Sequence, residues 1–208
     1  MFENRSVPSI WNIALNAWII QDGNYPDFFL GQIAEFAVKF YQPRETPFAP
    51  SSLPISAVPV SGLAYRVVGR TVLHSDRITV LDIGILVYCD FSPDTEHFAA
   101  VPVFETELQL SVDPFLYFEA LSKLPDIPAL IYTWRIAGIL QETGPFVEIE
   151  SGLSTGQKMR VRDATQRGYK EISRTDAWND EKGGCAEYIF RCELQPIPPK
   201  LVSSTAAD

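Results

Sequence analysis

Apolar and polar side chains alternate with a period of two in at least six stretches of this 208-residue chain. Because successive side chains of a β-strand point to opposite faces, each stretch predicts a half-buried strand. A helix would also fit residues 33–40, since Ala and Glu favour helices, but the alternation there favours a strand. The expected strands cover residues 10–21, 31–41, 63–73, 78–89, 103–112, 130–141 and 186–194.

Turn-forming residues indicate how some of these strands are joined. Residues 74–77 (His-Ser-Asp-Arg) predict a turn, so the strands on either side of it are expected to form a hairpin. Gly84 predicts a bulge or a close approach of another backbone segment. Five prolines in residues 42–61 predict an extended surface connection without regular pairing, because proline has no amide donor; a binding loop is the alternative.

One short helix is expected among the strands. Asp113 and Pro114 are typical of a helix start, and the apolar residues after them recur at three- or four-residue spacing. This pattern predicts an amphipathic helix over residues 114–124. Many short strands with a single helix indicate a mainly β fold, either an antiparallel barrel or a two-sheet sandwich.

The chain length fits a single β-rich domain over residues 1–200. The polar segment 143–185 exceeds usual loop lengths, so we expect it to contain a hairpin of its own or a functional excursion. Residues 201–208 have no pattern and are expected to be a flexible tail.

Composition points to a packed, soluble, cytoplasmic protein. Hydrophobic residues make up 46% of the chain, which is ordinary for globular proteins. The apolar run at 10–20 contains two asparagines and is too short to span a bilayer, and no signal-peptide pattern precedes it, so we expect no membrane association. Cys89, Cys185 and Cys192 match no zinc spacing and are expected to be buried or incidental thiols.

The formal net charge of −9 constrains the partner. An acidic protein is poorly suited to neutralise phosphates, so nucleic acid is an unlikely general partner. The acidity favours a basic protein partner and salt-sensitive association, although solubility alone would also explain it. Residues 143–185 are the exception, because seven acids and seven bases balance there.

The chain lacks the common catalytic motifs. It contains no phosphate-binding loop, no dinucleotide-binding glycine pattern and no nucleophile elbow. His74 lies in the expected hairpin turn and His97 in a polar connection, and both are expected to be non-catalytic. We therefore expect no cofactor, no metal site and no catalytic residue, and the balance of these observations favours a protein that is not an enzyme.

Four residues are candidates for a pocket. Asp82 interrupts an apolar run, and a buried carboxylate must be paired or reach solvent. Glu105 and Glu107 share one face of a strand and would suit acid–base work or cation binding if desolvated, although a solvated strand face is the simpler interpretation. Trp134 would line the same pocket or lie in the core. The expected ion-pair partners of Asp82 are Arg66, Arg70 and Arg135.

A second group of candidates lies in the 143–185 segment. Trp178 stands in a polar setting, which predicts an exposed side chain able to anchor a partner. Aromatic residues interleaved with cations are typical of surfaces that stack bases or sugars. The basic residues of this candidate binding set are Arg160, Arg162, Arg167 and Lys170.

These observations favour a non-enzymatic protein-interaction module, one version being an immunity or antitoxin-like inhibitor of a basic partner. The main alternative is a small-molecule or oligosaccharide binding protein, or an enzyme, with a pocket at one end of a barrel. Single-stranded nucleic-acid binding is a weaker alternative. Exposed strand edges would also permit a homo-oligomer.

Overall fold

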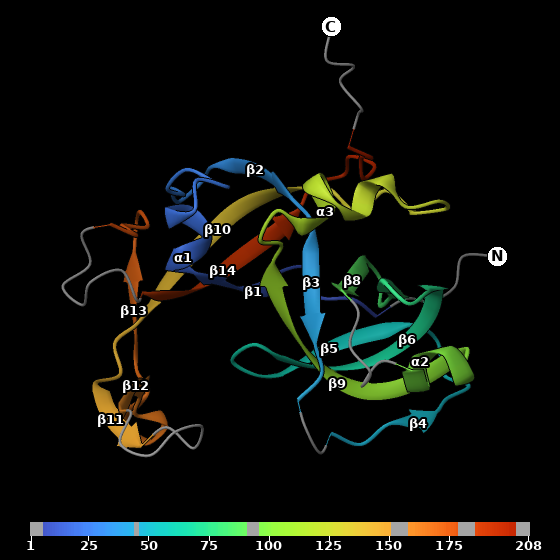
Figure 1. Ribbon diagram of the computed structural model, residues 1–208, viewed down its shortest axis with the longest axis horizontal. Helices are drawn as coiled ribbons and strands as arrows, with labels where there is room; N and C mark the ends of the chain where they lie inside the picture. Colours follow the sequence, from blue (N-terminus) through green and yellow to red (C-terminus); the bar gives the residue numbers. More distant parts are fainter. Residues whose placement is uncertain (1–5, 44–45, 91–95, 151–157, 179–185, 203–208) are drawn as a thin grey trace, which may run out of the picture.

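The computed structural model describes residues 6–43, 46–90, 96–150, 158–178 and 186–202 (Figure 1). It confirms the mainly β fold: 51% of the chain is strand and 11% is helix. The helices are short, and no helix among the described residues is long and apolar enough to cross a membrane.

A closed five-stranded barrel forms one half of the molecule. Each barrel strand pairs with two neighbours, in the closed order β3, β9, β6, β7, β8 and back to β3. Four of these pairings are antiparallel, whereas β3 and β8 are parallel, so the barrel is mixed. The strands are β3 (Val38–Tyr41), β6 (Ala64–His74), β7 (Ile78–Asp82), β8 (Leu86–Asp90) and β9 (Val103–Val112).

A second group of strands extends the sheet away from the barrel (Figure 1). β9 makes a parallel contact with β1, and the sheet continues through β14 and β10 to the edge strand β13. The short strand β2 pairs with the other half of β10. These strands are β1 (Trp11–Asn16), β2 (Ile33–Phe36), β10 (Tyr132–Glu142), β13 (Tyr169–Ile172) and β14 (Glu187–Leu194).

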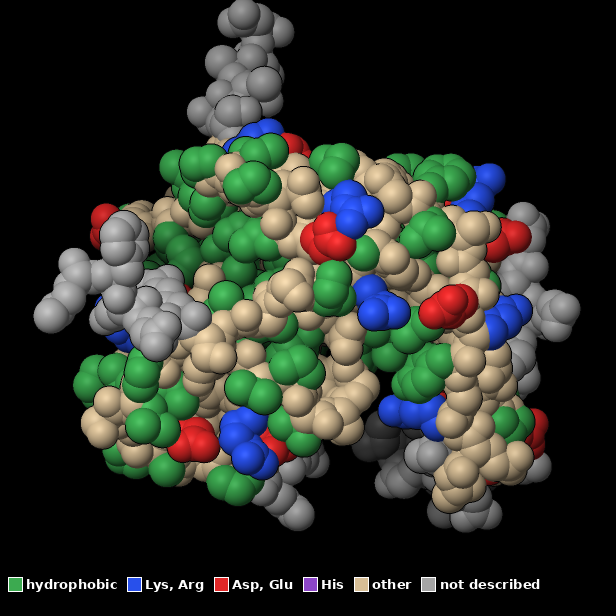
Figure 2. All heavy atoms as spheres, turned by 180° about the vertical axis from the view of Figure 1, so that it is seen from behind, with side chains coloured by type: hydrophobic (Ala, Val, Ile, Leu, Met, Phe, Trp, Pro, Cys, Tyr) green, Lys and Arg blue, Asp and Glu red, His purple; other side chains and the backbone are tan. Residues whose placement is uncertain are grey.

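The segment 143–185 contains a separate two-stranded hairpin, which we call the arm, followed by β13. The arm consists of β11 (Phe146–Glu150) and β12 (Lys158–Arg162), and it projects from the end of β10 beside the barrel (Figure 1). From behind, a hollow separates the arm from the barrel at the lower edge of the molecule (Figure 2). Acidic and basic side chains are interspersed on this face rather than gathered by sign (Figure 2).

The prediction of one strand over 10–21 is wrong in its second half. β1 ends at Asn16, which pairs with Glu187, the first residue of β14. Because the partner strand provides no further residues, the chain turns into the helix α1 (Ala17–Gln21). The helix buries Ile19 and Ile20 and leaves Trp18 exposed.

Two other expected strands are each divided. The segment 31–41 is interrupted at Ala37, so that β2 joins the outer sheet and β3 joins the barrel. The segment 78–89 is a hairpin of β7 and β8 with a turn at Ile83–Ile85, where the Ile83 amide donates to the Ile85 carbonyl (3.0 Å). Gly84 has φ +105° in this turn, a conformation that favours glycine.

The proline-rich segment 42–61 was expected to be unpaired, and this is also wrong. β5 (Ser56–Ser61) pairs with β6, and β4 (Ala49–Pro50) pairs with β9. Pro59 is accommodated because β5 is an edge strand, where a missing amide donor breaks no second ladder.

The predicted helix over 114–124 is present as two short pieces, α3 (Leu116–Glu119) and the 3-10 helix η2 (Leu121–Lys123). Asp113 starts it as expected, because its Oδ1 accepts hydrogen bonds from the amides of Leu116 (3.0 Å) and Tyr117 (3.4 Å). A third helix, α2 (Glu96–Ala100), lies beside the barrel strand β6.

Candidate functional site

Asp82 is held in an ion pair inside the barrel wall. Arg70, directly opposite on β6, donates from Nη2 to Asp82 Oδ2 at 3.1 Å, and the Gly84 amide donates to Oδ1 at 2.9 Å. Both carboxylate oxygens therefore have partners, one of them the predicted Arg70. The structure shows the paired arrangement that was one of the two interpretations of this residue.

The other pocket candidates lie apart from Asp82 in their surroundings. Trp134 is fully buried, stacks on Phe36 with ring centroids 5.7 Å apart and donates from Nε1 to the Phe36 carbonyl at 3.3 Å. Glu105 and Glu107 lie on the solvent-facing side of β9, where Glu107 pairs with Arg66 at 3.6 Å. Neither of the two pockets described below is lined by any of these four candidates.

The basic candidates of the 143–185 segment divide between strands. Arg160 lies in β12 opposite Glu148 in the register of the arm, and Lys170 is exposed on β13 opposite Gln141. Arg162 and Arg167, in contrast, both turn back toward acidic residues of the outer sheet. Only these last two are brought together, and the acids that they meet were not predicted.

Arg162 is almost completely buried, with 5% of its side chain exposed. Its Nη1 donates to the Gly144 carbonyl at 2.7 Å, and its guanidinium lies 4.3 Å from the centre of the Phe146 ring. Its Nε is 3.9 Å from Glu187 Oε2. Arg162 thus fastens the arm to the start of β14.

Glu142, the last residue of β10, is the buried acid at this junction, with only 4% of its side chain exposed. Arg167 Nε lies 3.0 Å from Glu142 Oε1, although the geometry is not that of a hydrogen bond. Glu142 also hydrogen-bonds the side chain of Glu187. Two carboxyl groups in direct contact must share a proton, because both ionised forms would repel each other.

The environment of Glu187 favours its protonated form near neutral pH. Burial raises the pKa of Glu187 to about 7, and the hydrogen bond and negative charge of Glu142 contribute to the rise. The positive charges of Arg162 and Arg167 oppose it. An acid that titrates near neutral pH beside a cavity is a candidate functional group.

A cavity of about 180 Å³ adjoins these side chains, and we call it the glutamate pocket. Its wall combines acidic, amide, aromatic and aliphatic groups from both halves of the molecule. Local sequence patterns did not reveal it, because Glu142 and Glu187 meet only through the pairing of β10 with β14. The lining residues are Ala14, Asn16, Leu63, Gln109, Glu142, Arg167, Tyr169, Glu187, Tyr188 and Ile189.

Exposed apolar side chains occur on three adjoining segments, 17–21, 27–30 and 173–178, that are bonded to one another. Gln21 Nε2 donates to the Ala177 carbonyl at 2.6 Å, and the Leu30 amide donates to the Ser173 carbonyl at 2.8 Å. Trp178 exposes 65% of its surface, as predicted. Together the exposed residues form what we call the aromatic surface: Trp18, Phe29, Leu30 and Trp178.

The backbone under the aromatic surface is anchored by Asp27. Its Oδ1 accepts from the hydroxyl of the buried Thr175 (2.8 Å) and from the Ala177 amide (3.4 Å), while Oδ2 pairs with Arg174 (3.3 Å). The Arg174 guanidinium lies 4.9 Å from the centre of the Phe29 ring. The exposed aromatics therefore stand on an ordered support.

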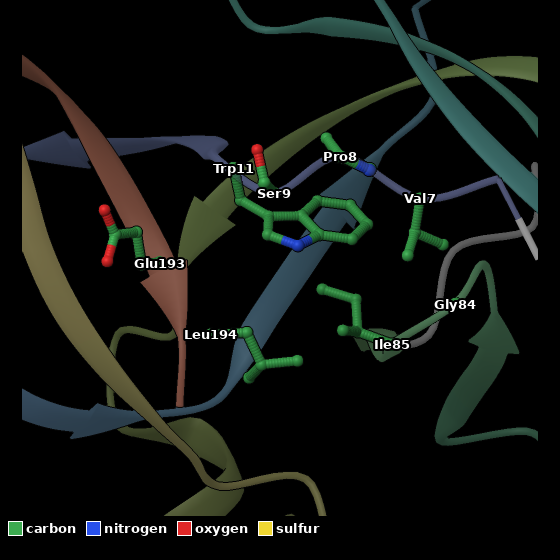
Figure 3. Close-up of a pocket in the computed structure, with 8 residues that line it drawn as sticks. All are labelled: Val7, Pro8, Ser9, Trp11, Gly84, Ile85, Glu193 and Leu194. Carbon is green, nitrogen blue, oxygen red and sulfur yellow. The ribbon is translucent and has the colours of Figure 1, made fainter. Parts of the chain in front are cut away.

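A second, mainly apolar pocket of about 350 Å³ lies beside the turn between β7 and β8 (Figure 3). Trp11, Ile85, Leu194 and Val7 point toward a common space, whereas Glu193 points away (Figure 3). A Cβ added to Gly84 would lie 2.1 Å from Val7 Cγ1, so the close approach expected at this glycine is confirmed. Pro8 and Ser9 complete the lining.

Within the described ranges, no group of three or more His, Cys, Asp or Glu side chains could hold a metal ion. Cys89 and Cys192 are free thiols, and Cys185 lies outside the described residues. Comparison of the chain with known protein families, curated proteins and solved structures finds no match.

Proposed function

We propose that this protein is a non-enzymatic protein-interaction module that binds a basic partner through the aromatic surface. The observation that carries the proposal is Trp178, which exposes 65% of its surface on an anchored backbone. Tryptophan is among the side chains most enriched at the energetic centres of protein interfaces. An exposed indole with no role in the core of its own chain gains most from a partner that covers it.

The support under the aromatic surface lowers the cost of binding. Asp27 joins the segment that carries Phe29 to the segment that carries Trp178, through Thr175 and the Ala177 amide. Ordering loops and side chains at an interface consumes part of the binding free energy. A surface that is already ordered loses less of it.

Charge around the aromatic surface favours a basic partner. Asp22, Asp27 and Asp176 surround it among the described residues, against the single base Arg174. Complementary charge would accelerate association and make it sensitive to salt. An immunity or antitoxin-like inhibitor of a basic protein, acting in the cytoplasm, is one concrete form of this function.

The test is capture of partners from the native host at low and moderate salt with wild-type protein and the Trp178→Ala variant. We expect wild type to retain a specific basic protein, less of it at moderate salt, and Trp178→Ala to bind it at least about tenfold more weakly. Tyr41→Ala is the matched control, because Tyr41 is a similarly exposed aromatic on β3. Equal capture by wild type and Trp178→Ala, or no specific partner at either salt, would contradict the proposal.

The apolar pocket of Figure 3 favours a second candidate, a small-molecule binding protein. The pocket lies at an end of the barrel and presents Trp11, Ile85 and Leu194 to a ligand. Apolar linings with few polar groups are typical of small-molecule sites. Thermal-shift screening with apolar ligands and oligosaccharides tests it, and a panel without any stabilising ligand would remove it.

A further inference from the structure

We infer that the glutamate pocket is a binding site for a guanidinium group, supplied by an arginine side chain of the basic partner. The identity of the source rests on the proposed function, whereas the chemistry of the pocket stands independently of it. Four strands and the loop before β13 build the site, so it belongs to the folded framework.

The size of the cavity fits this ligand. Its volume of about 180 Å³ is roughly six times the ~30 Å³ that one water occupies in the liquid. That space holds a guanidinium and part of its aliphatic stem. Leu63 and Ile189 provide apolar contact for the stem, and Tyr169 provides an aromatic ring that a guanidinium can stack on.

The pocket has more hydrogen-bond acceptors than donors. Glu142 Oε1 is buried and accepts no hydrogen bond from any described residue, although Arg167 is close enough for an ion pair. Asn16 and Gln109 add carbonyl oxygens to the wall. A guanidinium brings five N–H donors in a planar fork, the geometry that carboxylates bind best.

Charge balance leads to the same ligand. The two glutamates and the two arginines, Arg162 and Arg167, sum to zero when both acids are ionised. The proton shared by Glu142 and Glu187 raises this sum to +1. A guanidinium that replaces the proton leaves the sum at +1, so the exchange adds no net charge to a partly buried cluster.

The glutamate pocket and the aromatic surface are connected through Tyr188. The Tyr188 side chain lines the pocket, and its hydroxyl accepts from the Asp176 amide (3.3 Å), two residues before Trp178. One partner placing an aliphatic or aromatic patch on Trp178 can therefore reach the pocket with a neighbouring arginine.

The experiment is calorimetric titration of the full chain with N-acetyl-arginine amide at pH 6 and pH 8, in two buffers of different ionisation enthalpy. Since Glu187 titrates at about 7, binding should release close to one proton at pH 6 and few at pH 8, and affinity should rise about tenfold from pH 6 to pH 8. N-acetyl-norleucine amide, which lacks the guanidinium, is the control ligand and should not bind.

Variants connect this signal to the pocket. Glu187→Gln keeps the shape of the protonated acid, so it should fold, lose the proton release and bind about tenfold more weakly than wild type at pH 8. Glu171→Gln, an exposed glutamate on the same edge strand β13, should behave as wild type. No binding by wild type at millimolar ligand, or equal binding by folded Glu187→Gln at pH 8, would overturn the inference.

Failure of this inference and failure of the proposed function give different results. If a partner is captured through Trp178 but the arginine amide does not bind, the function stands and the pocket assignment is wrong. If the arginine amide binds but no partner is captured, the pocket chemistry stands without the proposed function. If both bind, Glu187→Gln should weaken capture of the partner at pH 8.

Discussion

Buried acids are treated differently in the barrel and at the junction of the arm with the outer sheet. In the barrel wall, each oxygen of Asp82 has one donor, Arg70 or the Gly84 amide, and no cavity adjoins it among the pockets described. At the junction, Glu142 and Glu187 contact each other, and a cavity lies beside them. The barrel therefore satisfies its charges internally, whereas the junction leaves acceptors for a ligand.

Strand pairing explains this difference. Every barrel strand pairs on both sides, so its side chains face either a filled interior or solvent. The junction is made where strands end: Glu142 is the last residue of β10 and Glu187 the first of β14. Strand ends leave space that the next loop does not fill, and ligand sites in many folds are built at such places.

The largest expected effect separates two phenylalanines. Phe104→Ala in β9 removes a fully buried ring that contacts Phe48 and Phe98, and should reduce the free energy of unfolding by about 3–5 kcal/mol. Phe146→Ala in β11 removes a half-buried ring that contacts Arg162, and should cost about 1 kcal/mol. Chemical denaturation of both variants measures the difference, and equal losses would show that the arm is as tightly integrated as the barrel.

The second effect compares two acids. Asp82→Asn weakens a buried ion pair and should reduce the free energy of unfolding by about 1–3 kcal/mol without changing ligand or partner binding. Glu187→Gln at pH 6 replaces an acid that is already protonated, and should change the stability by less than about 0.5 kcal/mol.

Denaturation at pH 6 measures both acid variants under one condition. A loss of partner binding in a stable Asp82→Asn protein would contradict a purely structural role for Asp82. A large loss of stability in Glu187→Gln would mean that Glu187 is ionised and paired in the folded protein at that pH.

The smallest effect is a pH dependence of stability. The pKa of Glu187 rises on folding from its ordinary value of 4.5 to about 7, so the folded state holds a proton there that the unfolded state has lost. Stability from this group is complete below pH 4.5 and is lost as the pH rises through 7. Relative to Glu187→Gln, wild type should therefore become less stable across this range.

Thermal unfolding of both proteins at closely spaced pH values checks this prediction. The pKa of the buried Asp113 is also raised, to about 6, and its contribution falls with rising pH in the same way. Both proteins retain Asp113, so its contribution cancels in the difference between them. A difference that stays constant between pH 4.5 and 7 would contradict the shared proton at the junction.

Much of the fold could be predicted from local patterns. The strand over 103–112 and the helix start at Asp113 follow from side-chain alternation and capping chemistry, and both are present. β7 was merged with β8 because all five of its residues are buried, which hides the period of two on which the prediction depends. The unexpected strand β5 carries Pro59, whose cost depends on whether the strand lies at an edge.

The candidate sites were predicted less completely. The exposure of Trp178 and the pairing of Asp82 with Arg70 could be expected, because a polar neighbourhood and an interrupted apolar run are visible locally. The meeting of Glu142 with Glu187 could not, since 45 residues separate them (187 − 142) and nothing in either strand identifies the other. Arg162 and Arg167 looked like free cations until the acids opposite them were known.

The sequence by itself determined that this chain forms many short strands around an apolar core, with one exposed tryptophan and an acidic surface. Those properties depend on neighbours within a few residues, where side-chain period and turn chemistry act. Only the tertiary structure decided that the sheet closes into a mixed barrel and that two glutamates share a cavity with two arginines. Both depend on which strands pair, and that choice is made by packing between segments far apart in the chain.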